Sequence, residues 1–280
     1  MKLAAKPANS KRHKTMTQNH PSILSRIVED TRGIVAKRKK IRSSSALEQL
    51  PYFARTCLSL EEALGARSFS VIAEAKKASP SQGIIREQFD PVEIATQYQK
   101  AGAAAVSILT EPVHFLGDVQ YLADCRDALS IPILRKDFIF DPYQIVEAKA
   151  FGADAILLIA TILSKSQLAE LQATANELGL SVLLEVYAES ELERVDVANT
   201  PIIGANSRNL HTFEVDLNEA IRVLSKLPQT CKRIAESGIH SSADLLLLQA
   251  NGIDGALIGE SFMRQQQPGD ALSSFISAIS

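Results

Sequence analysis

The sequence predicts an α/β protein that forms a (β/α)8 TIM barrel with an N-terminal helical extension. From Ser70 onward, short β-type runs alternate with helical patterns, as in a parallel sheet built from βα units. Eight such units in about 210 residues suit a closed barrel, whose usual size is about 250 residues. Six of the apolar runs end on residues capable of chemistry, and a barrel brings the last residues of parallel strands to one rim.

A doubly wound open sheet is the alternative fold. It fits less well, because no strand is followed by a GxGxxG turn and the reactive residues follow at least five different strands instead of one switch point. The predicted strands, in order, are 70–75, 104–109, 132–136, 155–159, 181–185, 201–205, 232–236 and 255–258.

Helix signals separate these strands. Asp90-Pro91 and Asp141-Pro142 each place a capping residue before a proline that needs no N–H. Glycine closes both helices and two further ones. Apolar residues at helical spacing give two of the outer helices one face for the sheet, namely Leu168, Leu171, Ala175 and Leu178 in one and Leu217, Ile221 and Leu224 in the other.

Residues 1–22 are basic and lack both acidic residues and the apolar core of a secretion signal. We expect a disordered tail or a start at Met16, with an organelle transit peptide as the alternative. A helix over 23–41 carries one apolar stripe, and a second helical stretch over 46–64 follows. We expect residues 23–280 to form a single barrel domain that includes these N-terminal helices (23–65), with the first helix roofing part of the site.

Composition argues against several classes of partner. The chain is 46% hydrophobic and 22% charged with a net charge of −2, which gives no general electrostatic case for nucleic acid or a membrane surface. No apolar stretch reaches the roughly 18 residues that span a bilayer. Cys57, Cys125 and Cys231 lack metal-ligand spacing, so we expect free thiols, no bound metal and a reducing, cytoplasmic location. The histidines lack metal spacing too, and we expect His114 to be solvated, with ligand contact as the alternative.

Lysines and carboxylates at the strand ends are the candidate acid–base groups. Lys76 and Lys136 follow the first and third strands, where desolvation and a neighbouring cation are expected to lower the pKa of Lys136. Glu74 and Glu185 alternate in phase with inward-pointing apolar residues, so their carboxylates should face the lumen and handle protons. Solvated surface charges or structural ion pairs are the alternatives. For Glu236, after the seventh strand, structural support and catalysis are equally open.

Two glycine-containing pairs predict a phosphate site. Ser237-Gly238 and Gly259-Glu260 follow the last two strands, where barrels commonly bind phosphate through backbone N–H groups. Glu260 would contribute its N–H, with its carboxylate turned away. The segment SPSQG at 79–83 is long for a βα loop and rich in turn formers, which indicates a flap over a ligand.

Several segments together resemble the indole-3-glycerol phosphate synthase family of barrel enzymes. The resemblance runs from about residue 22 to residue 275 and keeps the order of the motifs. It is more specific than a shared fold, because related phosphosugar barrels lack AEAKKASPS and LRKDF together. The segments are IAEAKKASPSQG, SILTEPVHFLGD, ILRKDFIFDPYQ, GADAILLI, LLEV, GANSRNLHTFEVDL, AESGI and ALIGESFMR.

The resemblance implies a carboxy-lyase of tryptophan biosynthesis that converts 1-(2-carboxyphenylamino)-1-deoxyribulose 5-phosphate into indole-3-glycerol phosphate, with loss of carbon dioxide and water. It implies no cofactor and no metal, a small phosphorylated molecule as partner, and other tryptophan-pathway enzymes as possible partners. Lys136 would be the general acid for ring closure, Glu185 would manage protons in the dehydration, and Lys76 would pair with the substrate carboxylate. Glu74 and Asn206 would orient the reacting chain.

The resemblance also implies the remaining contacts with substrate. The residues around the reacting part of the substrate would be Ser79, Phe115, Phe138, Leu157, Arg208, Leu210, Glu236 and Leu257, and the phosphate residues would be Ser237, Gly238, Gly259 and Glu260. One rival is another phosphosugar barrel, such as an aldolase with Lys136 as its Schiff-base lysine, which borohydride trapping would identify. The other is a non-catalytic ligand-binding barrel, in which at least one of Lys76, Lys136 and Glu185 would be expected to be lost; all three are present.

Overall fold

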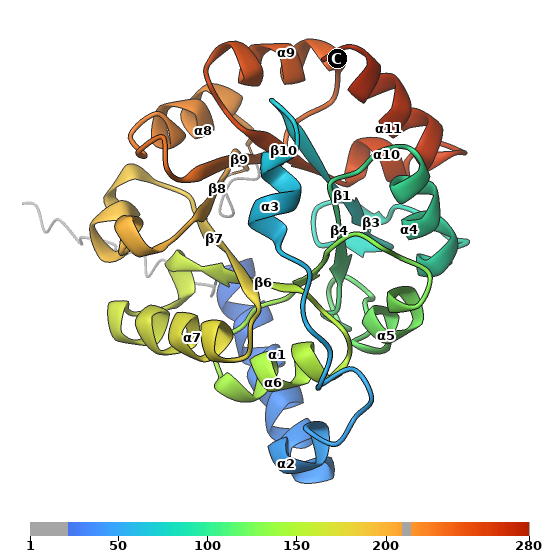
Figure 1. The fold of residues 1–280 in the computed structure, drawn as a ribbon, viewed down its shortest axis with the longest axis vertical. Helices are drawn as coiled ribbons and strands as arrows, with labels where there is room; N and C mark the ends of the chain where they lie inside the picture. Colours follow the sequence, from blue (N-terminus) through green and yellow to red (C-terminus); the bar gives the residue numbers. More distant parts are fainter. Residues whose placement is uncertain (1–21, 209–213, 280) are drawn as a thin grey trace, which may run out of the picture.

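Eight parallel strands close into a barrel in the order β1-β10-β9-β8-β7-β6-β5-β4, ringed by helices (Figure 1). The structure, a computed structural model, describes residues 22–208 and 214–279. Every strand lies within one residue of its predicted range, so the predicted barrel is confirmed. The strands are β1 (Ser70–Ala75), β4 (Ala105–Leu109), β5 (Ile133–Lys136), β6 (Ala155–Ile159), β7 (Ser181–Val186), β8 (Ile202–Asn206), β9 (Lys232–Glu236) and β10 (Gly255–Ile258).

The outer helices begin and end at the predicted signals. The carboxylates of Asp90 and Asp141 accept hydrogen bonds from the first turns of α4 and α6, and Gly102 and Gly152 have φ of 92° and 88°, which favours glycine. The helices are α4 (Pro91–Lys100), α5 (Gln120–Arg126), α6 (Pro142–Ala150), α7 (Lys165–Glu177), α8 (Leu217–Leu224), α9 (Ser242–Ala250), α10 (Glu260–Met263) and α11 (Pro268–Ser277), with a 3-10 turn η1 (Ala160–Ile162) after β6.

One unit departs from the expected strand–helix repeat. Two 3-10 helices, η2 (Glu189–Arg194) and η3 (Val197–Asn199), follow β7 where an α-helix was expected. The buried carboxylate of Glu191 explains the short turns, because it accepts hydrogen bonds from the Tyr187 backbone N–H (2.7 Å) and the Thr161 hydroxyl (2.7 Å). These bonds hold η2 against the carboxyl end of β7.

Alternation along the strands separates two apolar cores. Residues such as Ile72, Leu134 and Leu183 point into the lumen, and their neighbours pack outward against the helices. Leu60 and Leu64 of α3 (Leu60–Gly65) join the lumen cluster and close its lower end; α3 lies in front of the strands in Figure 1. The opposite end holds the carboxyl ends of the strands.

The N-terminal helix α1 (Ile23–Ile41) begins as predicted, with the Ser22 hydroxyl accepting a hydrogen bond from the Ser25 N–H. Leu24 and Ile27 belong to the lumen cluster, so α1 covers the carboxyl ends of the strands. Arg38 pairs with Glu147 (3.1 Å) on α6, and Lys39 pairs with Asp141 (2.9 Å). The roof expected from the apolar stripe is therefore present.

The prediction of one helical stretch over 46–64 was wrong. The segment contains α2 (Ser44–Leu47), turns around Pro51, an extended stretch and then α3. Pro51 cannot donate within a helix, and the Ser59 hydroxyl caps a new helix by accepting from the Glu62 N–H (3.1 Å). The extended stretch is what allows the chain to pass from the roof to the lower end of the barrel.

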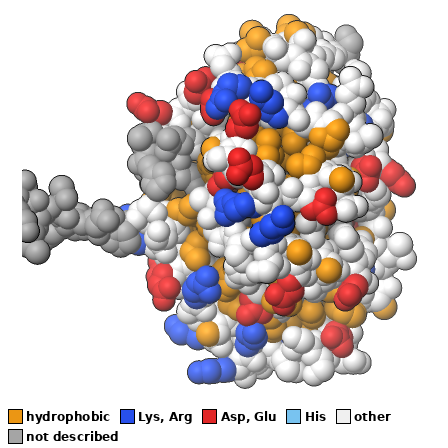
Figure 2. Space-filling view, turned by 90° about the vertical axis from the view of Figure 1, so that its left-hand side faces the viewer, with side chains coloured by type: hydrophobic (Ala, Val, Ile, Leu, Met, Phe, Trp, Pro, Cys, Tyr) orange, Lys and Arg blue, Asp and Glu red, His pale blue; other side chains and the backbone are white. Residues whose placement is uncertain are grey.

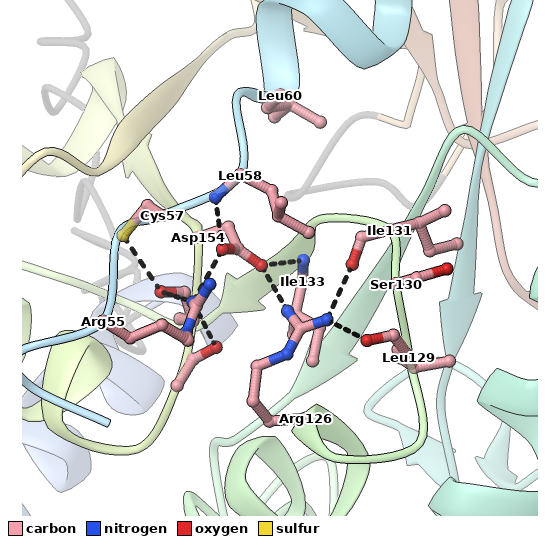
Figure 3. A network of polar contacts seen from close by, with 12 residues as sticks. Arg55, Cys57, Leu58, Leu60, Arg126, Leu129, Ser130, Ile131, Ile133 and Asp154 are labelled. Atoms are coloured by element: carbon pink, nitrogen blue, oxygen red, sulfur yellow. Dashed lines mark hydrogen bonds and ion pairs between the residues drawn. The ribbon is translucent and has the colours of Figure 1, made fainter. Parts of the chain in front are cut away.

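Asp154 fastens this stretch to the lower end (Figure 3). Its carboxylate is fully buried and accepts from Arg55 (2.7 Å), the Leu58 N–H (2.7 Å), Arg126 (2.5 Å) and the Ile133 N–H (2.9 Å). Two cations and two backbone donors satisfy a charge that would otherwise be costly to bury. The extension is thus anchored at both ends of the barrel.

On the side formed by α7 and α8, basic and acidic side chains lie intermixed around apolar areas (Figure 2). Arg222 pairs there with Glu189 (2.8 Å) and Glu219 (2.6 Å). Exposed pairs of this kind contribute little stability. Within 22–208 and 214–279, no helix combines the length and apolar composition needed to cross a membrane.

Deleting residues 1–44 should raise KM several-fold and lower the melting temperature. The deletion removes the buried Leu24, Ile27 and Val35, and burial of each such side chain stabilises by about 1.5–3 kcal/mol. It also removes part of the pocket wall. Activity assays and thermal melts would check both effects, and deletion of residues 1–20 is the control expected to change neither. A 45–280 chain with wild-type KM and melting temperature would contradict the roofing role.

Candidate active site

The carboxyl ends of five strands bring charged and amide side chains together in the mouth of the barrel. Glu74 comes from β1, Lys136 from β5, Glu185 from β7, Asn206 from β8 and Glu236 from β9. Lys136 Nζ lies 3.2 Å from Glu185 Oε2 and also bonds Glu236 Oε2, so one ammonium bridges two carboxylates. The Asn206 amide donates to Glu185 Oε1 (3.3 Å). The three carboxylates are buried, and Lys136 and Asn206 are partly exposed to the pocket.

Glu74 of β1 and Lys76, which directly follows β1, form a second pair, with 2.8 Å between Lys76 Nζ and Glu74 Oε1. Glu74 therefore pairs with its neighbour along the strand instead of with a lysine across the lumen. Gly259 makes space for it, because a Cβ at Gly259 would lie 2.7 Å from Glu74 Oε1 and 3.0 Å from Glu74 Cβ. The pair lies against the loop between β10 and α10.

The expected lowering of the pKa of Lys136 was wrong. Burial alone would lower it, but the carboxylates of Glu236, Glu185 and Glu74 together raise the pKa of Lys136 above its ordinary value. The sequence argument assumed that a second cation would dominate, whereas three carboxylates surround this amine. Lys136 is accordingly held as an ammonium ion.

The pKa values of Glu185 and Glu236 shift in opposite directions. Burial and the proximity of Glu185 outweigh the effect of Lys136 and together raise the pKa of Glu236 to about 8. Burial also opposes ionisation of Glu185, but Lys136 and a hydrogen bond from Tyr187 outweigh it and lower the pKa of Glu185. Glu236 is therefore the member of the pair that takes up a proton first as the pH falls.

Apolar side chains form a slot above this cluster. Phe115 and Phe138 lie with ring centroids 6.0 Å apart, and Leu157 and Leu257 line the same pocket. Leu24 of α1 covers it. Such a slot suits a flat aromatic ring held against polar groups.

The loop that carries Phe115 is folded around a buried carboxylate. Glu111 accepts hydrogen bonds from the N–H groups of Val113 (3.0 Å), His114 (2.6 Å) and Phe115 (3.0 Å). The expectation that His114 is solvated was wrong, because its Nε2 lies 2.8 Å from Asp30 of α1 and its side chain is only 19% exposed. This contact ties the loop to the roof helix.

The far end of the pocket presents backbone from the last two βα loops. Ser237 and Gly238 both have positive φ, 66° and 70°, and Gly259 precedes the short helix α10. The Glu260 carboxylate lies 2.9 Å from Arg264 and 3.6 Å from Arg208, so two guanidinium groups compensate its charge. Backbone conformations of this type commonly create anion-binding concavities.

The segment at 79–83 forms a small hairpin, β2 (Ala78–Ser79) and β3 (Gly83–Ile84), instead of an unstructured loop. Ser79 lines the pocket. Gln82 at the hairpin tip accepts a hydrogen bond from Arg264 (2.6 Å) near α10. The segment that is expected to form a flap is thus a strand pair, and its tip lies beside the last βα loop.

Among the described residues, one predicted site residue lies outside the pocket lining. Glu236 is 1% exposed and lies beneath Lys136, so it supports the pocket floor instead of lining the wall. Leu210 falls outside the described residues. The others line one pocket, namely Glu74, Lys76, Ser79, Phe115, Lys136, Phe138, Leu157, Glu185, Asn206, Arg208, Ser237, Gly238, Leu257, Gly259 and Glu260.

Sequence reasoning missed two residues of the site. Tyr187 lies two positions after Glu185, and its hydroxyl accepts from the Asn206 amide (3.1 Å); the period of two along a strand could have found it. Gly204 faces the lumen beside Glu236, and any Cβ there would collide with the Glu236 carboxylate. In the described part of the chain, no cluster of three or more His, Cys, Asp or Glu has an arrangement suited to a metal ion.

Residues 24–275 match the model of a protein family described as indole-3-glycerol phosphate synthase. A protein of that name from Salinibacter ruber is 52% identical over 254 residues, which cover 90% of this chain and 94% of the relative. Another of that name, from Polynucleobacter asymbioticus, is 51% identical over 214 residues, covering 76% of this chain and 80% of the relative.

Solved structures of lower identity share the fold. The 3-hexulose-6-phosphate synthase of Salmonella typhimurium matches with a TM-score of 0.62 at 10% identity, covering 75% of this chain and 98% of that one. The thiamine phosphate pyrophosphorylase of Pyrococcus furiosus matches with a TM-score of 0.56 at 14% identity, covering 79% and 98%. At these identities the two matches show the barrel alone.

Proposed function

Because the chain belongs to the indole-3-glycerol phosphate synthase family, we propose that its Lys136 cluster carries the ring closure that defines the reaction of the family. The protein is a carboxy-lyase of tryptophan biosynthesis that acts on a small phosphorylated substrate. The substrate carboxylate leaves as carbon dioxide and the carbonyl oxygen leaves as water, so the reaction consumes one proton overall. The site must therefore supply protons at one atom and accept one at another.

Lys136 is the general acid of the ring closure. When the aromatic carbon attacks the carbonyl carbon, negative charge develops on the carbonyl oxygen, and an ammonium in contact can donate a proton to it. The observation that carries this assignment is the contact of Lys136 with Glu185 and Glu236, which keeps the amine protonated. Because an alkoxide is a stronger base than an amine, the transfer is favourable even from a lysine of raised pKa.

Glu185 accepts the carbon-bound proton that is lost when the new ring is dehydrated. Its carboxylate is 2% exposed on the side-chain scale, ionised, and in contact with Lys136. The raised pKa of Glu236, which lies directly beneath Lys136, suits it to return a proton to the amine after each turnover. Donor and acceptor thus lie side by side and need no large movement between the two steps.

The other groups position the substrate. Lys76 pairs with the carboxylate of the substrate, and Glu74 and Asn206 orient the hydroxyl and amine groups of the substrate. Holding the reacting atoms in contact can contribute several kcal/mol to catalysis, typically about 7–11 kcal/mol in favourable cases. The aromatic ring occupies the apolar slot, and the walls of the substrate site comprise Ser79, Phe115, Phe138, Leu157, Arg208 and Leu257.

The charge state of Lys136 also argues against the aldolase interpretation. A Schiff-base lysine must attack as the neutral amine, which requires a lowered pKa. The carboxylates around Lys136 raise its pKa. A turnover assay with 1-(2-carboxyphenylamino)-1-deoxyribulose 5-phosphate, in which indole fluorescence appears only with the intact chain, tests the proposal. Absence of turnover, or covalent trapping of substrate by borohydride at Lys136, would overturn it.

Inorganic phosphate should inhibit competitively, because it would occupy the backbone cradle between Ser237-Gly238 and Gly259-Glu260 that receives the substrate phosphate. The same fluorescence assay at several phosphate concentrations checks this prediction, with an equal ionic strength of chloride as the control. A crystal soaked in phosphate should show density at the cradle. Noncompetitive inhibition, or an anion bound only at Lys76, would contradict the assignment.

The remaining assignments concern the chain as a whole. Residues 23–280 act as one barrel domain, with the N-terminal helices as part of the site. Its location is the cytoplasm, a compartment that suits Cys57, Cys125 and Cys231, which are free thiols in the structure. Other enzymes of tryptophan biosynthesis are candidate partners, since they share its substrate and product.

A further inference from the structure

Tyr187 closes a ring of hydrogen bonds in the mouth of the barrel. The Asn206 amide donates to both Glu185 Oε1 (3.3 Å) and the Tyr187 hydroxyl (3.1 Å), which uses both of its hydrogens. The hydroxyl therefore accepts from Asn206 and directs its own proton elsewhere. The Glu185 carboxylate shares the Asn206 amide with this hydroxyl, and Lys136 and the hydroxyl together lower the pKa of Glu185 against the opposing effect of burial. Glu185, Asn206 and Tyr187 thus form a closed triangle.

The triangle is held from outside the site. The Tyr187 backbone N–H donates to the buried Glu191 carboxylate (2.7 Å), whose other oxygen accepts from Thr161 (2.7 Å). The two 3-10 helices after β7 place Glu191 where it can make both contacts. The Tyr187 ring packs against the lumen cluster, so neither end of the residue can turn away easily.

Resting on the proposed role of Glu185, we propose that Tyr187 is a positioning residue of the reaction, whose hydroxyl holds the Asn206 amide and the Glu185 carboxylate in the orientation that proton transfer requires. The charged and polar groups that face Glu185 are Lys136 from β5, Asn206 from β8 and Glu236 from β9. Lys136 binds Oε2, Asn206 binds Oε1, and Glu236 shares Lys136. Tyr187 is a neutral donor beside these groups, and the donor strength of its hydroxyl can be altered without moving a charge.

Tyr187→Phe keeps the ring and removes the hydroxyl. A hydrogen bond to a charged group is lost, so the single-turnover rate should fall roughly tenfold with KM within about twofold of wild type. Loss of a donor disfavours the ionised carboxylate, so Glu185 titrates at higher pH. The acidic limb of the rate–pH profile should therefore move upward by roughly one unit. Single-turnover measurement prevents product release from hiding the chemical step.

Replacing Tyr187 by 3-fluorotyrosine gives a second, shape-preserving test. The more acidic phenol is a stronger donor, so the acidic limb should move to lower pH, opposite to the phenylalanine variant. This variant also keeps the inference testable if Tyr187→Phe fails to fold. The matched control is Tyr121→Phe on α5, where the ring packs against Phe89 away from the pocket. It should leave rate and profile unchanged.

The Glu185→Gln variant distinguishes a failure of the proposed role of Glu185 from a failure of the inference on Tyr187. A slow Glu185→Gln beside a Tyr187→Phe with wild-type rate and pH profile would overturn the inference on Tyr187 alone. A Glu185→Gln with wild-type rate would overturn the proposed role of Glu185. A Tyr187→Phe that only melts at a lower temperature, with its pH profile unchanged, would show a purely structural residue and also overturn the inference. If the inference holds, adding Tyr187→Phe to Glu185→Gln causes little further loss.

Discussion

Turnover of the Lys136→Ala variant is expected to fall by at least roughly 10³-fold, while substrate affinity stays within about tenfold of wild type. Without the ammonium, nothing in contact with the carbonyl oxygen donates a proton as the ring closes. The phosphate cradle and the apolar slot are untouched, so binding persists. Steady-state fluorescence kinetics together with a direct binding measurement would separate the two quantities.

The variant also leaves Glu185 and Glu236 without their shared cation. We expect one of the two to take up a further proton, since a neutral acid is far less costly to bury than an unpaired carboxylate. A thermal melt would check that the fold survives. Lys100→Ala, at the exposed end of α4, is the matched control and should behave as wild type. A Lys136→Ala enzyme within tenfold of wild-type turnover would refute the general-acid assignment.

Glu185→Gln is expected to lower turnover by roughly 10²-fold or more while the protein remains folded. Glutamine keeps the shape of the side chain and its contact with Asn206, but it cannot accept a proton. The acidic limb that belongs to Glu185 should disappear from the rate–pH profile. An acidic limb that is present in the wild-type profile and absent from that of the variant would identify Glu185 as the titrating group.

A structural ion pair would give a different outcome. If Glu185 served only to neutralise Lys136, then Glu185→Gln would mainly reduce stability, since Lys136 would keep only Glu236 as its direct carboxylate partner. Circular dichroism and thermal melts would reveal this. An unfolded variant, or a destabilised one with nearly normal turnover, would contradict the role in proton transfer.

The strands could be predicted from the sequence because each is a short apolar run bounded by glycine or a capping residue. The parallel arrangement then decides which side chains meet, so Glu74, Lys136 and Glu185 could be placed at one rim before the structure was known. The segment 46–64 was harder. Its apolar spacing is helical, but Pro51 and the buried Asp154 redirect the chain, and the partners of Asp154 are far apart in the sequence.

The electrostatics of the site could not be predicted in the same way. The rim position of Lys136 is local information, but the sign of its pKa shift depends on how many carboxylates reach it across the lumen. Glu236 likewise lies deep in the barrel because Gly204, on the neighbouring strand, has no side chain to fill the space that the Glu236 carboxylate occupies. The alternation of side chains along β7 could have predicted that Tyr187 faces the lumen, but its partner Asn206 lies on another strand and could not be identified in this way.

Two glycines in the mouth of the barrel have a consequence for how this sequence can evolve. Because Gly204 has no side chain, the Glu236 carboxylate can occupy the space beside it. Gly259 makes space for Glu74 in the same way. Even alanine at either position would require that carboxylate to move. We therefore expect each glycine and its glutamate to change together, so that a larger residue at 204 or 259 is tolerated only where the facing acid has been replaced first.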